Sequence, residues 1–385
     1  MRNIDPTVEE NPNFVQSKGN YFQIDLLKAV MIAFVIIDHA LGYTDHWGFG
    51  LELWERTAIP IFLIVLGFNW GNSFKKQGKK TLRELYSIEY FKEKLWRFIF
   101  PYLIFYLVST TFGFIIYGSI FPENFSENWF LEYIVFQKSL LQGPGNWFIP
   151  VLFQSILMIP LLYWFFTKRP VVTLILCFII EFSMHLFLFF YIGPITSLDL
   201  WNKEIYFRQT ILVVLSAIGM GLWFSQDHNL FSIRNLFVWI LFPFSLVYMI
   251  AWDFFNFRLE IGGSGIVRGD YNYITFIYSA LIFLIVLRLV PRNPRNWISK
   301  SISVMSKSTF HIYLVQDLFY ITLYIIYNDV WTTSGFVGLV NILGISSDDF
   351  LVNIGLLCLN WIICFSVGVI WFLSEKKFLK LIKRI

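Results

Sequence analysis

Charged residues are scarce in this chain of 385 residues. Asp, Glu, Lys and Arg together make up 15% of it, against about 25% in typical soluble domains, while 57% of the residues are hydrophobic. A soluble globular fold therefore does not account for the whole sequence. The net charge of +4 is small and gives no reason to expect nucleic acid as a partner.

The chain also has few cysteines and lacks the pattern of a cleavable signal peptide. The three cysteines, Cys177, Cys358 and Cys364, lie in apolar stretches, and their spacing fits neither a metal site nor a disulfide framework. The first twenty residues are polar and mixed in charge, without the basic, apolar and small-residue succession of a cleavable signal peptide. We predict no metal and expect the first helix to be its own insertion signal.

Long apolar stretches make up most of the sequence, and each is long enough to cross a hydrocarbon core about 30 Å thick. They predict an all-α polytopic membrane protein with about ten transmembrane helices, preceded by a segment 1–20 and followed by a basic tail 375–385. Residues 21–374 then form one transmembrane domain. The predicted spans are 24–42, 57–73, 96–117, 147–166, 171–191, 209–225, 235–252, 273–290, 309–327 and 352–373.

Basic residues divide unevenly between the two sides of such a bundle. If the N-terminus is inside, 24 of the 30 Lys and Arg residues fall in inner segments, while several outer loops are acidic. This asymmetry is the positive-inside pattern, so it predicts cytoplasmic termini and a multi-pass protein of the cell membrane.

Lys28 and His39 are polar residues inside the first apolar stretch. Eleven helical steps place them on one face about 16 Å apart, with Lys28 near the cytoplasmic side and His39 in the outer half. Charges within the bilayer are costly and mark functional sites. A snorkelling lysine and an interfacial histidine are the alternatives. Asp38 points about 100° away from His39, so it is not assumed to orient the ring.

Lys94 and Arg97 open the third span and are three residues apart, on one face of an α-helix. Two cations at a cytoplasmic mouth suit phosphate groups. The alternative is that they only close a basic inner loop.

These residues resemble the acyltransferase-3 family, whose integral membrane enzymes acylate cell-surface sugars and related acceptors. In that family a basic residue, ten intervening residues and a histidine mark the first helix, as Lys28 and His39 do here, and a basic pair spaced like Lys94 and Arg97 opens the third. Weaker matches follow in order along the chain, namely Pro60-Ile61-Phe62 with Gly67-Phe68, Asn146-Trp147-Phe148-Ile149-Pro150, and Ile312-Tyr313-Leu314 within residues 308–316.

The resemblance implies acyl transfer from acyl-coenzyme A, with acetyl-CoA as the commonest donor in the family, to a carbohydrate or lipid-linked hydroxyl. Lys94, Arg97 and Lys28 would then bind donor phosphates, and His39, with Lys28, would carry the catalysis as a base or a transient acyl carrier. Leu66 stands where many members have serine, and Gln316 where many have histidine. Neither departure is expected to touch Lys28 or His39.

Further polar residues are candidates for lining the substrate site. They are Asp38, Trp147, Glu181 and Asp317. Glu181 and His185 share a helix face, and a mutually satisfied structural pair is the alternative for them. A secondary transporter or a lipid-linked sugar flippase remains the alternative function, although no inverted repeat is found.

Overall fold

A computed structural model gives the fold, and residues 21–382 are described apart from several gaps. Helices dominate the described part, which also contains a short antiparallel pair, β1 (Glu260–Ile261) and β2 (Ser264–Gly265). The undescribed residues are 1–20, 41–52, 55, 121–144, 146, 189, 191–208, 256, 258, 262–263, 266–270, 295, 328–349 and 383–385.

Each of the ten predicted apolar segments coincides with a helix. In chain order these helices are α1 (Phe22–Ala40), α3 (Ala58–Lys76), α6 (Phe100–Ile120), α7 (Phe148–Lys168), α8 (Pro170–Phe187), α10 (Leu215–Gln226), α11 (Leu236–Phe255), α12 (Thr275–Leu289), α13 (Trp297–Tyr327) and α15 (Phe350–Ile382). Shorter helical segments are α4 (Leu82–Leu85), α5 (Ile88–Lys94), the π-helix η2 (Leu95–Ile99), and the 3-10 segments η6 (Ile211–Val214) and η7 (Ile233–Asn235).

Five helical segments of the described chain are long and apolar enough to cross a membrane: 82–113, 148–168, 170–187, 233–255 and 357–381. The helices at 211–226 and 275–289 are apolar but shorter. Helix α1 has 19 residues and carries three charged side chains, Asp25, Lys28 and Asp38, which lower its apolarity. The protein is therefore a multi-pass membrane protein, while the count of ten crossings stays a prediction.

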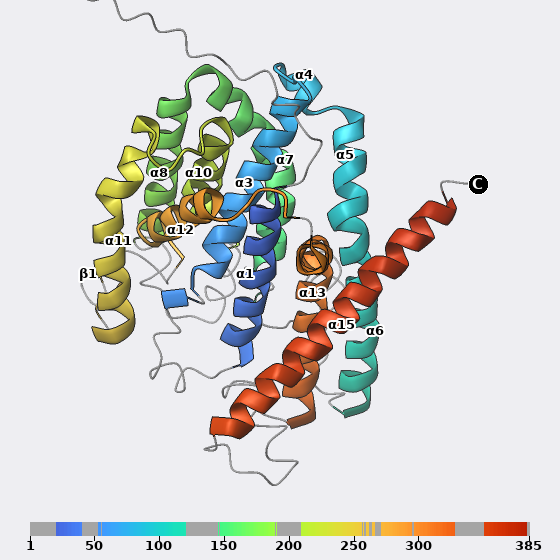
Figure 1. Ribbon diagram of the computed structural model, residues 1–385. Coiled ribbons are helices and arrows are strands. Elements are labelled where there is room, and N and C mark those ends of the chain that lie inside the picture. Colours follow the sequence, from blue (N-terminus) through green and yellow to red (C-terminus); the bar gives the residue numbers. More distant parts are fainter. Residues whose placement is uncertain are drawn as a thin grey trace, which may run out of the picture.

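Helix α3 is at the centre of the bundle and contacts α1, α7, α10 and α12 (Figure 1). Its contact with α10 is the most extensive between any two helices, because glycines let the backbones approach. A Cβ added at Gly67 would lie 2.3 Å from the Ile218 carbonyl oxygen, and one at Gly221 would lie 2.1 Å from that of Ile64. Gly67, which carries part of the family resemblance, is thus a packing residue.

The long helix α15 crosses α13 obliquely and also contacts α1 (Figure 1). Gly368 allows this crossing, since a Cβ there would lie 2.6 Å from the Cα of Ile312. Helix α15 continues to Ile382, so the predicted basic tail from residue 375 begins inside a helix. Side chains such as Leu107, Ile179, Phe244 and Ile370 are exposed on the outer helices, as lipid contact requires.

Candidate active site

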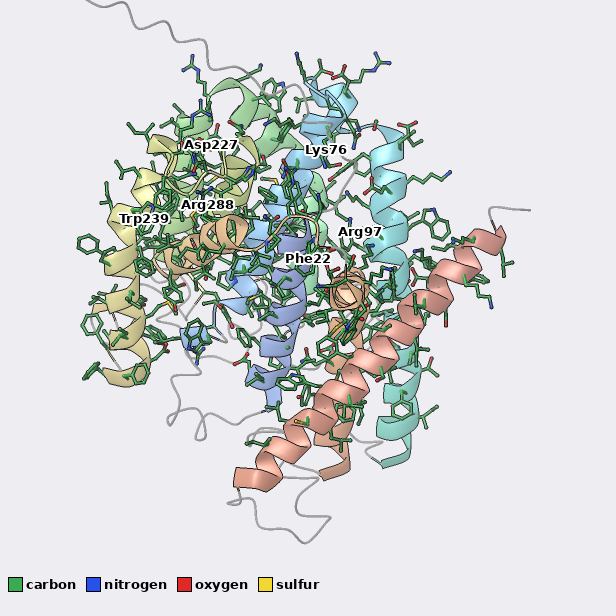
Figure 2. The ribbon with its side chains drawn as sticks, viewed as in Figure 1. Phe22, Lys76, Arg97, Asp227, Trp239 and Arg288 are labelled. Atoms are coloured by element: carbon green, nitrogen blue, oxygen red, sulfur yellow. The ribbon has the colours of Figure 1, made fainter. Side chains whose placement is uncertain are left out.

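A large cavity of about 1190 Å³ lies between α1, α3, η2, α7, α13 and α15. Its volume exceeds the range of about 300–1000 Å³ typical of small-molecule sites. The cavity has a basic end, because its lining residues Lys76 and Lys380 lie in the last turns of α3 and α15; Arg97 lies below Lys76 in the view of Figure 2. Its basic lining residues are Lys28, Lys76, Lys92, Arg97, Lys307, Lys376 and Lys380, and its acidic ones are Asp25, Glu93 and Glu375.

Lys28 lines this cavity and is bound to α13. Its Nζ donates to the carbonyl oxygen of Ser306 at 2.5 Å and to the hydroxyl oxygen of Ser306 at 3.1 Å. The same hydroxyl donates to Oδ1 of Asp25 at 2.6 Å. Asp25 and Lys28 are one helical turn apart, so Ser306 bridges a carboxylate and an ammonium on the same face of α1. The lysine is thereby held inside the bundle and does not snorkel to the surface.

Arg97 also lines the cavity, and it lies in the π-helix η2. Single π-helical turns widen the helix and change the direction of the side chains that follow, and they occur often at functional sites. The pairing of Lys94 and Arg97 on one face assumed α-helical winding. The junction between α5 and η2 falls between these two residues.

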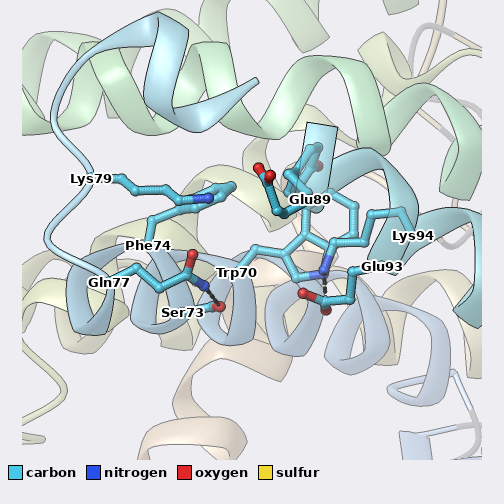
Figure 3. Close-up of a pocket in the computed structure, with 9 residues that line it drawn as sticks. Trp70, Ser73, Phe74, Gln77, Lys79, Glu89, Glu93 and Lys94 are labelled. Carbon is cyan, nitrogen blue, oxygen red and sulfur yellow. Dashed lines mark hydrogen bonds and ion pairs between the residues drawn. The ribbon is translucent and has the colours of Figure 1, made fainter. Parts of the chain in front are cut away.

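Lys94 faces a small cavity of about 60 Å³, shown in Figure 3, which shares Trp70, Ser73 and Glu93 with the large one. Its ammonium lies 4.6 Å from the ring centroid of Trp70 and 5.3 Å from that of Tyr90, and 2.9 Å from the Glu93 carboxylate. Only 4% of Lys94 is exposed, and within the described chain it is not among the residues lining the large cavity. In the described chain Lys94 thus lines the small cavity and Arg97 the large one.

The end of the large cavity away from its basic rim approaches His39. On α1 the cavity is lined by Lys28, Ile32 and Val35, and His39 is the next residue on that face, one turn beyond Val35. Tyr313, another lining residue, donates its hydroxyl proton to the carbonyl of Gly145. A Cβ at Gly145 would lie 3.1 Å from Cε1 of His39, so this backbone stands against the imidazole.

His39 itself has two polar neighbours. Its Nδ1 contacts the carboxamide of Gln316 on α13, and its Nε2 lies 3.7 Å from Oδ2 of Asp38. The prediction that Gln316 would have no contact with the Lys28 and His39 pair is wrong, because α1 and α13 pack side by side at this level. Asp38, adjacent in sequence, lies close to the ring although successive helical side chains diverge.

Trp147 and Asp317 lie near the His39 end of the cavity. Trp147 packs against Phe148 and Tyr271, with ring centroids 6.1 and 5.9 Å apart. Asp317 is fully buried and follows Gln316 on α13. Among the described residues neither lines the large cavity, whereas Phe148 and Tyr313 do. Asn146 lies outside the described residues.

Glu181 is placed away from the cavity, on α8. Its Oε2 accepts a hydrogen bond of 2.7 Å from the backbone N–H of Ser216, in the first turn of α10. A carboxylate there accepts from a backbone donor that would otherwise be unpaired, and its negative charge interacts favourably with the N-terminal end of the helix dipole. His185 Nε2 lies 4.0 Å from Oε1 of the same carboxylate. The geometry fits the structural alternative for this pair.

Several site residues were not singled out from sequence, namely Asp25, Ser306, Tyr313 as a lining residue, and the contact of Gln316. Tyr313 lies inside the Ile312-Tyr313-Leu314 match and Asp25 is three residues before Lys28, so proximity to these residues was the available signal. Ser306 had no signal beyond being one of several serines before residue 308. Within the described residues no group of three His, Cys, Asp or Glu side chains could hold a metal ion.

Tyr21, at the start of α1, is held by Arg292 and His228 at the basic end of the cavity. The guanidinium of Arg292 lies 4.1 Å from the ring centroid of Tyr21, and the His228 ring meets that ring edge-on at 6.1 Å. Burial lowers the pKa of His228 below its usual value, and the charge of Arg292 lowers it further. His228 is therefore a neutral packing residue beside the cavity wall.

Comparison with curated proteins and with solved structures gave no significant match. Comparison with protein families matches residues 21–374 to the acyltransferase domain of the acyltransferase-3 family. The match extends over far more than half of the chain and includes α1, with Lys28 and His39, and η2, with Arg97. With its apolar spanning helices, the chain belongs to the acyltransferase-3 family of membrane acyltransferases.

Proposed function

We propose that the protein transfers an acyl group, with acetyl as the first donor to test, from cytoplasmic acyl-coenzyme A to a hydroxyl of a surface carbohydrate or lipid-linked acceptor at the outer side of the cell membrane. The observation that best supports this proposal is the cavity, which begins at a basic rim and follows one face of α1 from Lys28 to within a turn of His39. Its length supports a donor with phosphates at one end and a reactive thioester at the other.

Phosphate binding is assigned to the cavity cations. Arg97 offers a planar set of donors that matches phosphate oxygens in pairs, and Lys28 adds a point charge that Ser306 and Asp25 hold in place. Lys76, Lys92, Lys376 and Lys380 supply further positive charge at the rim. Lys94 is left out of this set because its ammonium is held by Trp70, Tyr90 and Glu93.

His39 is the proposed general base. As the acceptor hydroxyl oxygen attacks the thioester carbonyl, its proton passes to the imidazole; the carbon–sulfur bond then breaks and the departing thiolate takes up the proton. The new ester and free coenzyme A are the products, and His39 is neutral again. The exposed fraction of the His39 side chain is 14%, so the ring is largely screened from water that would hydrolyse the thioester.

An assay with labelled acetyl-coenzyme A tests this function. The purified protein in liposomes, or membranes of cells expressing it, should move label from acetyl-coenzyme A into a carbohydrate or lipid product, and His39→Ala should reduce the rate at least a hundredfold. His228→Gln is the matched control, because His228 lies in the loop at the opposite end of the bundle and packs against Tyr21.

Two outcomes would contradict the proposal. More than a tenth of wild-type activity in folded His39→Ala would remove His39 from the chemistry. Movement of a sugar lipid across the bilayer without formation of an ester would instead support the transporter or flippase alternative. Mass spectrometry of surface glycans and lipids, with and without the protein, would identify donor and acceptor together.

A further inference from the structure

The two nitrogens of His39 have different surroundings. Nδ1 meets the carboxamide of Gln316, which is fully buried, while Nε2 lies 3.7 Å from a carboxylate oxygen of Asp38. Neutral imidazole carries one proton, and the partner of one nitrogen decides which nitrogen keeps a free lone pair. The contact between α1 and α13 is therefore placed to control the chemistry of the ring.

Other contacts limit how the ring can turn. Tyr320 meets it edge-on, with ring centroids 6.2 Å apart. The Tyr320 hydroxyl donates to the carbonyl of Ile36 at 3.2 Å and accepts from Nδ2 of Asn360 at 2.9 Å, which ties this neighbour to both α1 and α15. The Gly145 backbone stands against Cε1. The imidazole is thus confined on several sides, and Gln316 meets it at Nδ1.

A carboxamide can serve Nδ1 in either of two orientations. With its nitrogen toward the ring, Gln316 donates to Nδ1, and its oxygen is then buried without a hydrogen-bond partner among the described residues. This arrangement places the ring proton on Nε2 and leaves no free lone pair. A half turn of the carboxamide lets its oxygen accept the proton of Nδ1, and Nε2 then has a lone pair free.

We propose that Gln316 is a positioning residue whose oxygen holds the proton on Nδ1 of His39 and so makes Nε2 the nitrogen that receives the acceptor proton. The inference rests on the proposed role of His39 as the base. Once Nε2 is protonated, both nitrogens carry protons, and the carboxylate of Asp38 stabilises the cation until the thiolate removes the Nε2 proton. Asp38 on α1 and Asp317, Tyr313 and Tyr320 on α13 are the titratable groups near this contact.

Substitutions at Gln316 separate positioning from packing. Gln316→Met keeps most of the volume but cannot accept the Nδ1 proton, so we expect kcat to fall about 10- to 100-fold with the KM for acyl-coenzyme A within twofold of wild type. Gln316→Glu restores an acceptor and adds a charge that favours the protonated ring. Its activity should exceed that of Gln316→Met, and the acidic limb of its pH profile should move up by about 1 unit or more.

Gln154→Glu is the matched control for a partly buried carboxylate. The Gln154 carboxamide donates to the carbonyl of Gln209 at 3.0 Å and accepts from the N–H of Ile211 at 2.8 Å, away from His39. We expect no shift of the pH profile in this variant. An equal shift in Gln154→Glu and Gln316→Glu would overturn the positioning role, because it would reflect a general effect of added charge.

Nitrogen-15 spectra of ring-labelled histidine provide a readout that does not depend on activity. The signals of His39, identified by their loss in His39→Ala, should show the proton on Nδ1 in the wild type and a mixture of both forms in Gln316→Met. Wild-type kcat together with an unchanged ring signal in Gln316→Met would overturn the role of Gln316. Activity retained in His39→Ala would instead contradict the proposed function itself.

Discussion

Lys28 on α1 and Ser306 on α13 are joined by two hydrogen bonds, one to the serine carbonyl and one to its hydroxyl. Because the hydroxyl also donates to Asp25, the ammonium is fixed at the wall of the large cavity. Two helices distant in sequence therefore hold one charge at the cavity wall.

Ser306→Ala should weaken donor binding. The change removes the bridge between Lys28 and Asp25, and each lost hydrogen bond to a charged group contributes about 1.5–3 kcal/mol. Because the serine carbonyl remains as a partner, we expect a rise of roughly tenfold in the KM for acyl-coenzyme A, with kcat little changed. Ser308→Ala is the control, since that hydroxyl donates only to backbone carbonyls of its own helix in the described structure. Equal effects in both variants would refute the bridge.

Arg97 and Lys94 should respond differently to substitution, because only Arg97 lines the large cavity in the described part of the chain. Arg97→Ala should raise the KM for acyl-coenzyme A roughly 10- to 150-fold, as expected for loss of one charge-assisted contact, and Arg97→Lys should recover only part of this. Lys94→Ala should leave that KM within about twofold but lower the thermal midpoint in detergent, since it empties the contacts with Trp70 and Tyr90. Similar losses of calorimetric donor affinity in both variants would restore the paired model.

Gly67→Ala should disrupt the packing of α3 on α10. The added methyl group would meet the Ile218 carbonyl oxygen at 2.3 Å, and backbone cannot move aside as a flexible side chain can. Overpacking of this kind costs about 1–3 kcal/mol or more, so a lower thermal midpoint and poorer yield are expected. Gly355→Ala is the control, because nothing lies within 4 Å of its Cβ position. An unchanged midpoint in Gly67→Ala would show that this crossing is looser than described.

Sequence alone located the helices well because the hydropathy of a membrane-spanning segment reports its length and composition directly. It also pointed to Lys28 and Arg97, which both line the cavity. A helical period gives the face of a residue but not the helix opposite that face. The partnership of Ser306 with Lys28, and of Gln316 with His39, depends on how α13 packs against α1.

That Lys94 and Arg97 line different cavities could not be predicted for a different reason. Spacing rules assume regular α-helical winding, and the π-helix at Leu95–Ile99 breaks that assumption between the two residues. Glu181 was a candidate lining residue because an ionisable residue in an apolar stretch is treated first as functional, and the structure fits the structural alternative that was kept beside it. Its partner, the first turn of α10, lies more than thirty residues further along the chain.

The last prediction concerns direction across the membrane. If the basic rim faces the cytoplasm and His39 lies about 16 Å further along α1, donor and acceptor reach the site from opposite sides. Sealed right-side-out vesicles should then acylate an external acceptor only when acyl-coenzyme A is loaded inside, because its charged phosphates do not cross lipid unaided. Vesicles with donor outside and vesicles carrying His39→Ala are the controls.

Equal activity with the donor supplied only outside would show that both substrates use one face. Cysteine labelling would then identify which premise failed, on a Cys358→Ser background that removes the exposed native thiol while Cys177 and Cys364 are buried. A cysteine at Lys79, which follows α3 at the basic end, should be labelled only from inside. One at Glu127, in a loop predicted from sequence to be external, should be labelled from outside. If both labels have the expected sides, the orientation holds and the passage of the donor through the bundle is the premise to abandon.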